Sequence, residues 1–159
     1  MIKLYKATPG GVLYHEAWTT DAAITEHWGK LGDRGSTRDH ALTEDQDPDD
    51  ALEEVLAPAR SAGFAEFDDD DLRILLIEYR IDGVGNSADL SKRHALEDRM
   101  NEVLGWVGLG HCDGGSIGAG TMEVCCRVID FELARTAIEA DLAGSTFSDY
   151  SRIFDEAAR

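Results

Sequence analysis

One acidic run near the middle of the sequence does most to limit how this chain can fold. It consists of Glu66 and the four consecutive aspartates Asp68 to Asp71. Adjacent carboxylates repel one another and stay in water, so this stretch has no means of joining a packed core. The 159 residues are therefore predicted to form two small modules, 1–67 and 73–159, joined by an acidic link at 68–72.

The whole chain is strongly acidic. Its 32 acidic and 15 basic side chains give a formal charge of -17, and 43% of its residues are apolar. This apolar content predicts a folded protein rather than a disordered acidic tail. The negative charge repels phosphate backbones, which disfavours direct binding to nucleic acid.

Three further features bear on the compartment. The sequence has no run of about 18 apolar residues, so we expect no helix that crosses a membrane. Residues 1–5 lack the apolar stretch of a secretory signal. The three cysteines, two of them adjacent, do not suggest a disulfide framework, which is typical of a reducing compartment. We therefore expect a cytoplasmic protein.

The first half has the pattern of strands followed by one helix. Alternation of apolar and polar residues predicts four strands, at 2–5, 12–19, 24–31 and 36–42. Asp50 is predicted to cap the helix, with Glu53 as its capping-box partner. Pro58 is expected to kink or end the helix, and Gly63 to stop it.

This half resembles the WGR domain. The residues Trp28-Gly29-Lys30-Leu31-Gly32, followed by Gly35, stand where that family carries W-G-R-I-G…G, and Gly63-Phe64 stands where it carries Gly-Tyr. The resemblance covers about residues 1–67 and departs at Lys30, where the family has arginine. It implies a small antiparallel module that contacts DNA ends or neighbouring domains, as WGR modules do in poly(ADP-ribose) polymerases. The 17 acidic and 6 basic side chains of residues 1–71 argue against the DNA role.

The second half has the order β-α-β-β-α-β, which resembles the ferredoxin-like split βαβ pattern. Its strands are predicted at 73–81, 106–110, 121–129 and 150–154. Asp89 or Ser91 is expected to begin the first helix and Asp130 to cap the second. The predicted fold class is thus α+β in both halves.

This topology makes the first and third strands neighbours and places both helices on one face of the sheet. The other face would then carry a mixture of apolar residues, such as Ile74 and Leu76, and charged residues, such as Glu78 and Arg127. Such a face is too apolar to be simply solvated. It would pack on the first module, on a second copy of the chain or on a partner, and we favour internal packing or a homodimer.

The residues that offer chemistry are few. The glycine-rich stretch 110–120 contains His111, Cys112 and Asp113, but adjacent residues of a strand point to opposite faces, which separates the imidazole from the thiol. We interpret the stretch as a flexible hairpin, since its glycines match no phosphate-binding motif. The cysteines Cys112, Cys125 and Cys126 form no C-x-x-C pair, so no metal site is predicted. A small enzyme that uses Cys112 is the least favoured function, and we expect no cofactor.

The favoured function is a non-enzymatic acidic protein that recognises a basic macromolecular partner. Inhibitors that cover basic active sites, including immunity proteins against nuclease-type toxins, have charge of this kind, and a large negative field speeds association with a cationic partner. The residues predicted to contact the partner are Trp28, Lys30, Arg34, Asp45, Asp47, Asp49, Asp50, Asp68, Asp69, Asp70 and Asp71.

Two other functions remain open. The acidity can serve only to keep the protein dissolved. Alternatively, the chain is a nucleic-acid-associated WGR accessory protein, which requires a local basic strip from Lys3, Lys6, Lys30, Arg34 and Arg38.

Overall fold

The chain divides into two compact units, Met1–Asp69 (unit 1) and Asp70–Arg159 (unit 2). The computed structural model describes residues 1–158, except for the side chain of Asp69. The boundary falls inside the acidic stretch that the sequence singles out as a link. Part of that stretch is ordered as η1 (Asp69–Asp71), a single turn of 3-10 helix.

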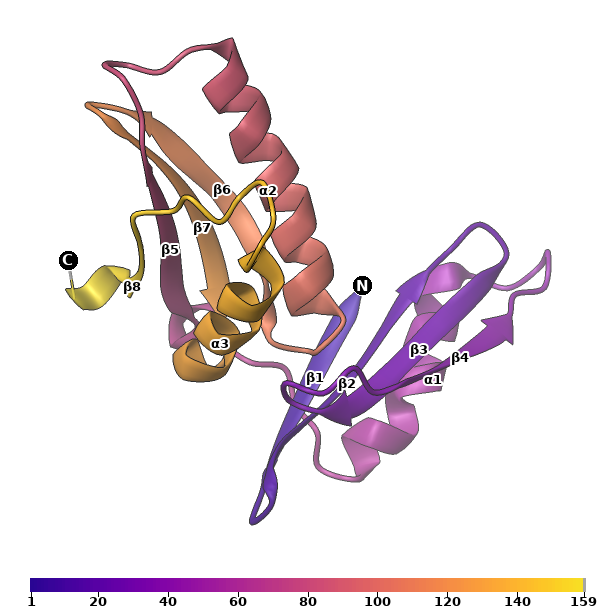
Figure 1. Ribbon diagram of the computed structural model, residues 1–159. Coiled ribbons are helices and arrows are strands. Elements are labelled where there is room, and N and C mark those ends of the chain that lie inside the picture. The colour runs from indigo at the N-terminus through magenta and orange to yellow at the C-terminus, as the bar shows by residue number, and fades with distance from the viewer. Residues whose placement is uncertain (159) are drawn as a thin grey trace. The chain divides into compact units, whose positions relative to one another are not determined.

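Unit 1 is a four-stranded antiparallel sheet covered by one helix, α1 (Pro48–Ser61) (Figure 1). Its strands are β1 (Ile2–Thr8), β2 (Gly11–Thr19), β3 (Ala23–Lys30) and β4 (Ser36–Ala41). They lie in the order in which they occur in the chain, so each strand is paired with its neighbour through a short turn. The four strands expected from residue alternation are confirmed.

Helix α1 begins and ends differently from the prediction. Asp47, not Asp50, is the N-cap, because its carboxylate accepts hydrogen bonds from the backbone N–H groups of Asp49 and Asp50. Pro48 then occupies the first turn, where a missing N–H leaves no hydrogen bond unmade. Pro58 does not end the helix, which continues to Ser61.

The end of α1 explains why Pro58 is tolerated. The proline lies in the last turn, so its missing N–H removes only the hydrogen bond to the Glu54 carbonyl, and the buried Leu56 and Ala59 nearby hold this end of the helix against the core. Gly63 then takes a φ of 90°, and the N–H of Phe64 donates to the carbonyl of Ala59 at 3.1 Å. This left-handed glycine with its returning hydrogen bond is a common helix stop, as predicted.

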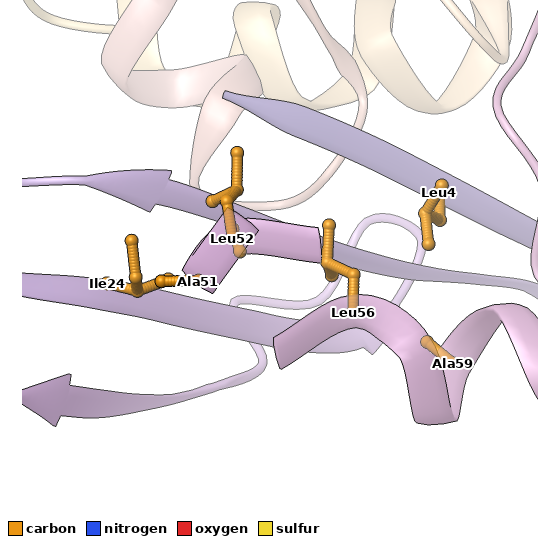
Figure 2. Close-up of a cluster of buried hydrophobic side chains, with 7 residues drawn as sticks. Leu4, Ile24, Ala51, Leu52, Leu56 and Ala59 are labelled. Carbon is orange, nitrogen blue, oxygen red and sulfur yellow. The ribbon is translucent and has the colours of Figure 1, made fainter. Parts of the chain in front are cut away.

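The core of unit 1 lies between α1 and one face of the sheet. Figure 2 shows Leu52 and Leu56 of α1 directed at the strands that carry Leu4 and Ile24. The remaining members of the cluster are alanines, namely Ala17, Ala51 and Ala59. Each fully buried leucine contributes about 1.5–3 kcal/mol, so this core is modest.

Unit 2 contains a second antiparallel sheet with two helices. In chain order its elements are β5 (Arg73–Arg80), α2 (Ser87–Gly105), β6 (Gly110–Gly118), β7 (Thr121–Val128), α3 (Phe131–Leu142), β8 (Arg152–Asp155) and the 3-10 turn η2 (Glu156–Ala158). The strands lie in the order β6-β7-β5-β8. The first and third strands are therefore neighbours, as expected of the split βαβ pattern, and the α+β fold class is confirmed.

A continuous apolar layer fills the space between this sheet and its helices. Figure 1 shows α2 and α3 on the same face of the sheet, as predicted. The side chains between them are fully or almost fully buried: Leu75, Ile77, Tyr79, Leu96, Met100, Leu104, Met122, Val124, Cys126, Val128, Ile138 and Leu142. Within residues 1–158, no helix combines the length and apolar character needed to cross a bilayer.

Two local predictions in unit 2 are wrong. Helix α2 starts earlier than Asp89 or Ser91, because Asn86 caps it while the Asp89 carboxylate accepts from the Asn86 N–H. The strand predicted at 106–110 does not form; Trp106 caps the end of α2 instead.

The glycine-rich stretch is itself a strand rather than a flexible hairpin. A Cβ on Gly110 would collide with the carbonyl oxygen of Arg127, and a Cβ on Gly115 with that of Glu123. Only glycine therefore lets β6 approach β7 this closely. Ala119 and Gly120 both have positive φ and make the two-residue turn between the strands.

Candidate binding surface

The densest group of charges in unit 1 surrounds the start of α1. Seven exposed carboxylates lie in the loop after β4 and in the first two turns of the helix, and we call them the acidic surface: Glu44, Asp45, Asp47, Asp49, Asp50, Glu53 and Glu54. No lysine or arginine occurs between Arg38 and Arg60. The helical part, from Pro48 to Glu54, spans only about 9 Å along the axis.

Two of these carboxylates have structural roles. Asp47 caps α1, and Glu53 pairs with Arg60 at 3.1 Å. For the other five, the described residues provide no side-chain partner. Asp49 and Asp50 lie in the first turn, where the positive end of the helix dipole favours carboxylates. Pro48 to Glu54 spans about one Debye length, so the charges of the carboxylates on this part of the helix add to one region of negative potential.

The other predicted contact residues in unit 1 lie away from this surface. Trp28 and Lys30 occupy the end of β3 that leads into the turn at residues 31–35, which contains Arg34. The acidic surface follows the opposite end of β4, a strand of six residues. That strand is about 20 Å long. Unit 1 thus has a cationic turn at one end of the sheet and carboxylates at the other.

The remaining predicted residues belong to the junction of the two units. Asp68, Asp70 and Asp71 are exposed, and the side chain of Asp69 lies outside the described part of the chain. Phe67, just before them, packs edge-on against the Tyr5 ring with 5.5 Å between centroids. These aspartates therefore belong neither to the acidic surface nor to the turn that contains Arg34.

Trp28 is half-buried among polar side chains rather than openly displayed. The His15 ring stacks on it at 5.9 Å, and the Arg38 guanidinium lies 5.4 Å from its centre. His15 also contacts one carboxylate oxygen of Glu26 at 2.7 Å, and His40 contacts the other at 2.8 Å. Trp28 thus packs beside a cluster of polar side chains on the sheet face that α1 covers.

Glu26 is the centre of this cluster. Burial opposes its ionisation, but the hydrogen bonds from His40 and His15 outweigh burial and lower the pKa of its carboxyl group. The Glu26 side chain is only 11% exposed. Glu26 is therefore held ionised between two imidazoles.

A second polar network lies on the other face of the same sheet. The Tyr14 hydroxyl donates to the Asp33 carbonyl at 3.0 Å and lies 3.0 Å from Nε2 of His27. Nδ1 of His27 contacts Glu16 at 2.8 Å, and Glu16 also pairs with Lys3 at 3.2 Å. Burial, followed by the charges of Glu16 and Asp33, raises the pKa of Tyr14 to about 12.

Tyr14 explains two glycines of the WGR-like signature. A Cβ on Gly29 would lie 2.8 Å from the Tyr14 hydroxyl oxygen, and a Cβ on Gly35 would overlap it and the Trp28 carbonyl. The glycines therefore make room for a buried tyrosine. The sequence predicts the strand at 12–19 but not this network, because alternation does not reveal that a glutamate is buried.

The basic strip required by the nucleic-acid alternative is divided. Lys3 and Lys6 lie on opposite faces of β1, since their positions differ by an odd number. Lys6 donates to the Ala62 carbonyl at the end of α1, and Arg38 is engaged with Trp28. Only Lys30 and Arg34 remain together near the β3–β4 turn.

In unit 2, the glycine-rich strand separates His111 from Cys112. Cys112 lies opposite Cys126 on the helix-facing side, whereas His111 lies opposite Arg127 on the other side. This confirms the expected separation of thiol and imidazole. Among residues 1–158, no three His, Cys, Asp or Glu side chains are grouped so as to hold a metal ion.

The sheet face away from the helices is partly covered by its own side chains. Arg152 makes two hydrogen bonds to Glu78, at 2.7 and 3.1 Å, and its guanidinium lies 4.0 Å from the centre of the Phe154 ring. Leu76 and Glu123 on this face are buried. Homodimerisation through this face remains a prediction.

No protein-family model, curated protein or solved structure matches this chain. The resemblance to WGR domains stays an expectation that rests on Trp28, Gly29 and Gly35. The function has to be inferred from the charges and contacts of the chain itself.

Proposed function

We propose that this chain is a non-enzymatic binding protein whose acidic surface recognises a basic macromolecular partner. The observation that carries the proposal is the concentration of charge at the start of α1. Seven exposed carboxylates occur from Glu44 to Glu54, with no lysine or arginine from position 39 to 59. Capping and the helix dipole account for Asp47, Asp49 and Asp50, whereas Glu44, Asp45 and Glu54 have no such structural role within residues 1–158.

Unit 2 provides the contrast that supports this proposal. Many of its carboxylates face a cation directly, as in the pairs Lys92–Asp149, Arg99–Asp141, Arg127–Asp113, Arg135–Glu132 and Arg152–Glu78. Exposed pairs of this kind stabilise a fold only slightly, but they neutralise the local field. The acidic surface of unit 1 lacks such neutralisation except at Glu53.

A cationic partner would be both attracted and held by such a surface. Concentrated negative potential steers a basic protein and raises its association rate, with a strong dependence on salt. An inhibitor that covers the basic active site of a nuclease-type toxin requires such a concentrated negative surface. We propose that this chain is an inhibitor of that class. The class is supported by charge alone, whereas no residue identifies a particular toxin.

The test compares two triple variants of equal net charge. Asp45→Lys, Asp49→Lys and Glu54→Lys reverse three carboxylates of the acidic surface and leave the Asp47 cap and the Glu53–Arg60 pair intact. The control variant carries Asp82→Lys, Asp98→Lys and Glu139→Lys, three exposed carboxylates of unit 2. The probe is a fluorescent oligolysine peptide, and its anisotropy is measured at low and physiological salt.

The acidic-surface variant should bind oligolysine at least about tenfold more weakly than the control variant. Equal weakening in the two variants would show that the peptide responds only to net charge, and the proposal would fail. Circular dichroism of both variants checks that each remains folded.

The WGR alternative is tested with the same apparatus. Lys30 and Arg34 lie near Trp28 at the cationic turn, which is the one feature that favours contact with DNA. A short blunt-ended duplex is the probe, and the variant is Lys30→Glu with Arg34→Glu. The alternative would be supported over the acidic-surface proposal if the wild-type chain binds the duplex, the variant does not, and the binding falls steeply with salt.

A further inference from the structure

We propose that Cys112 and Cys126 form a reversible dithiol–disulfide site, which exchanges with small-molecule disulfides and clamps β6 to β7. This site is separate from the acidic surface and does not depend on the proposed function. The proposal does not make either cysteine a catalytic residue. The inference rests on the register of two strands and on the different exposure of the two thiols.

The register places the two cysteines directly opposite each other. Cys112 on β6 pairs with Cys126 on β7, and their sulfur atoms are 2.6 Å apart. The N–H of Cys112 donates to the Asn101 side chain of α2 at 2.8 Å, so it points away from β7. The pair is therefore a non-hydrogen-bonded one, in which the Cα atoms of antiparallel strands approach to about 4.5 Å.

That spacing meets the requirement of a disulfide. Bridged cysteines have Cα atoms about 4.4–6.8 Å apart, so a bond can form here without separating or sliding the strands. The strand around Cys112 also has room to adjust, because a bulge follows it and a Cβ on Gly114 would meet no atom within 4 Å. The backbone thus allows both the reduced and the oxidised state.

The two thiols differ in access, which sets the order of reaction. Cys126 is fully buried, and its hydrogen bond with Cys112 together with burial raises the pKa of its thiol well above the ordinary value. Cys112 is half-buried on β6, the edge strand of its sheet, and is the more exposed of the two. Cys112 is therefore the thiol that meets an incoming reagent, and Cys126 is the thiol that resolves the product.

The exchange proceeds in two steps. The Cys112 thiolate attacks one sulfur of a small-molecule disulfide RSSR, which breaks the S–S bond, forms a mixed disulfide Cys112–S–S–R and releases one thiolate. Cys126 loses its proton to that thiolate and attacks the Cys112 sulfur, which releases the second R group as a thiolate that takes a proton from water. Overall, two protein thiols and RSSR give a protein disulfide and two RSH, so the protein is oxidised and RSSR is reduced.

Cys125 provides the internal control. Cys125 is adjacent to Cys126 in the sequence, so it is almost equally far from Cys112 along the chain. It lies on the opposite face of β7, however, where it is paired with Leu76 of β5. A disulfide between Cys112 and Cys125 would have to cross the sheet. Cys125 should therefore remain a thiol when the other two are oxidised.

The experiment treats the folded full chain with oxidised glutathione and measures free thiols and intact mass. The wild type should lose two of its three thiols and two hydrogens without retaining glutathione. Cys125→Ser should lose both remaining thiols in the same way. Cys126→Ser should instead retain glutathione on Cys112, and its internal disulfide should form at least about tenfold more slowly.

Cleavage of the chain before Asp113 completes the assignment, since it separates Cys112 from the other cysteines. The fragments should stay joined in oxidised Cys125→Ser and should part on reduction. The proposal is overturned if Cys125→Ser keeps both thiols or carries glutathione without an internal bond, or if Cys126→Ser forms an internal disulfide as fast as the wild type. Circular dichroism shows that each variant tested is folded.

Discussion

The two units share one plan and differ in what they bury. Each has a four-stranded antiparallel sheet, with one helix on one face in unit 1 and two helices on one face in unit 2. In unit 1 the small cluster around Leu56 is accompanied by buried Glu16, Glu26 and His27. In unit 2 the fully buried side chains between sheet and helices are apolar. Its least exposed carboxylates, Glu123 and Asp155, are paired with Ser116 and Arg73.

This difference shows two ways of stabilising the same architecture. Apolar layers gain free energy in proportion to the area they remove from water. Buried carboxylates lose hydration, and their partners offset that loss only when every oxygen is engaged. The stability of unit 2 should therefore depend on side-chain volume, and that of unit 1 on hydrogen-bond partners and pH.

The largest expected effect is on the core of unit 2. Leu104→Ala removes a fully buried side chain of α2 and should destabilise unit 2 by about 2–5 kcal/mol. The equivalent change in unit 1, Leu56→Ala, should have a smaller effect because its neighbours include three alanines. Hydrogen exchange of the strands of each unit measures the two losses.

Leu133→Ala is the control for this pair, since that leucine is 43% exposed on α3. Its effect should lie within about 0.5 kcal/mol of zero. A loss for Leu56→Ala that equals or exceeds that for Leu104→Ala would contradict the proposed difference between the two interiors.

A smaller but more specific effect is expected at Gly35. Its φ is 64°, and a Cβ there would overlap the Tyr14 hydroxyl and the Trp28 carbonyl. Gly83 has a φ of 63° with nothing near its Cβ, so Gly83→Ala should cost only the left-handed backbone penalty of about 1–2 kcal/mol. Gly35→Ala should cost more, because the buried tyrosine must also move.

Urea unfolding followed by hydrogen exchange measures both glycine variants. Equal losses of stability in Gly35→Ala and Gly83→Ala would show that the Tyr14 network does not constrain the β3–β4 turn.

The smallest expected effect concerns pH. The pKa of Glu26 is lowered in the folded chain, so its contribution to stability is present at neutral pH and is lost as the pH falls through that lowered value. Glu26→Gln removes the charge but keeps an acceptor and a donor beside His15 and His40. Unit 1 of the variant should therefore lose less stability than the wild type over this acidic range.

The measurement is the free energy of unfolding of unit 1 at a series of pH values, from hydrogen exchange of residues 2–41. Unit 2 of the same sample is the reference. If the free energy of unfolding of unit 1 falls equally with acid in the wild type and in Glu26→Gln, the buried carboxylate is not the source of the pH sensitivity.

Much of the local structure could be predicted from the sequence. The strand expected at 121–129 forms as β7, with the alternating residues Met122, Val124, Cys126 and Val128 buried, and Asp130 caps α3 as expected. Capping was less certain where several acids are adjacent: Asp47, Asp49 and Asp50 are all suitable, and only the position of Pro48 favours the first. Such patterns are readable because they depend on residues within a few positions of one another.

The candidate site was predicted only in part. The sequence identified four of the seven carboxylates of the acidic surface, Asp45, Asp47, Asp49 and Asp50, but not that they lie at the opposite end of the sheet from Trp28 and Arg34. The two groups are separated because β4 runs away from the turn that contains Arg34 before the chain reaches the acidic surface. Amino-acid composition gives no information about this direction.

What the sequence by itself determined is most of the helices and strands, their apolar faces and the surplus of negative charge. Only the tertiary structure decided that a glycine-rich stretch is a strand, that Tyr14 fills the space left by Gly29 and Gly35, and that Cys112 faces Cys126. The physical reason is that these features depend on contacts between strands. A side chain's neighbours across a sheet are set by register, whereas the pattern along one strand specifies only which face it occupies.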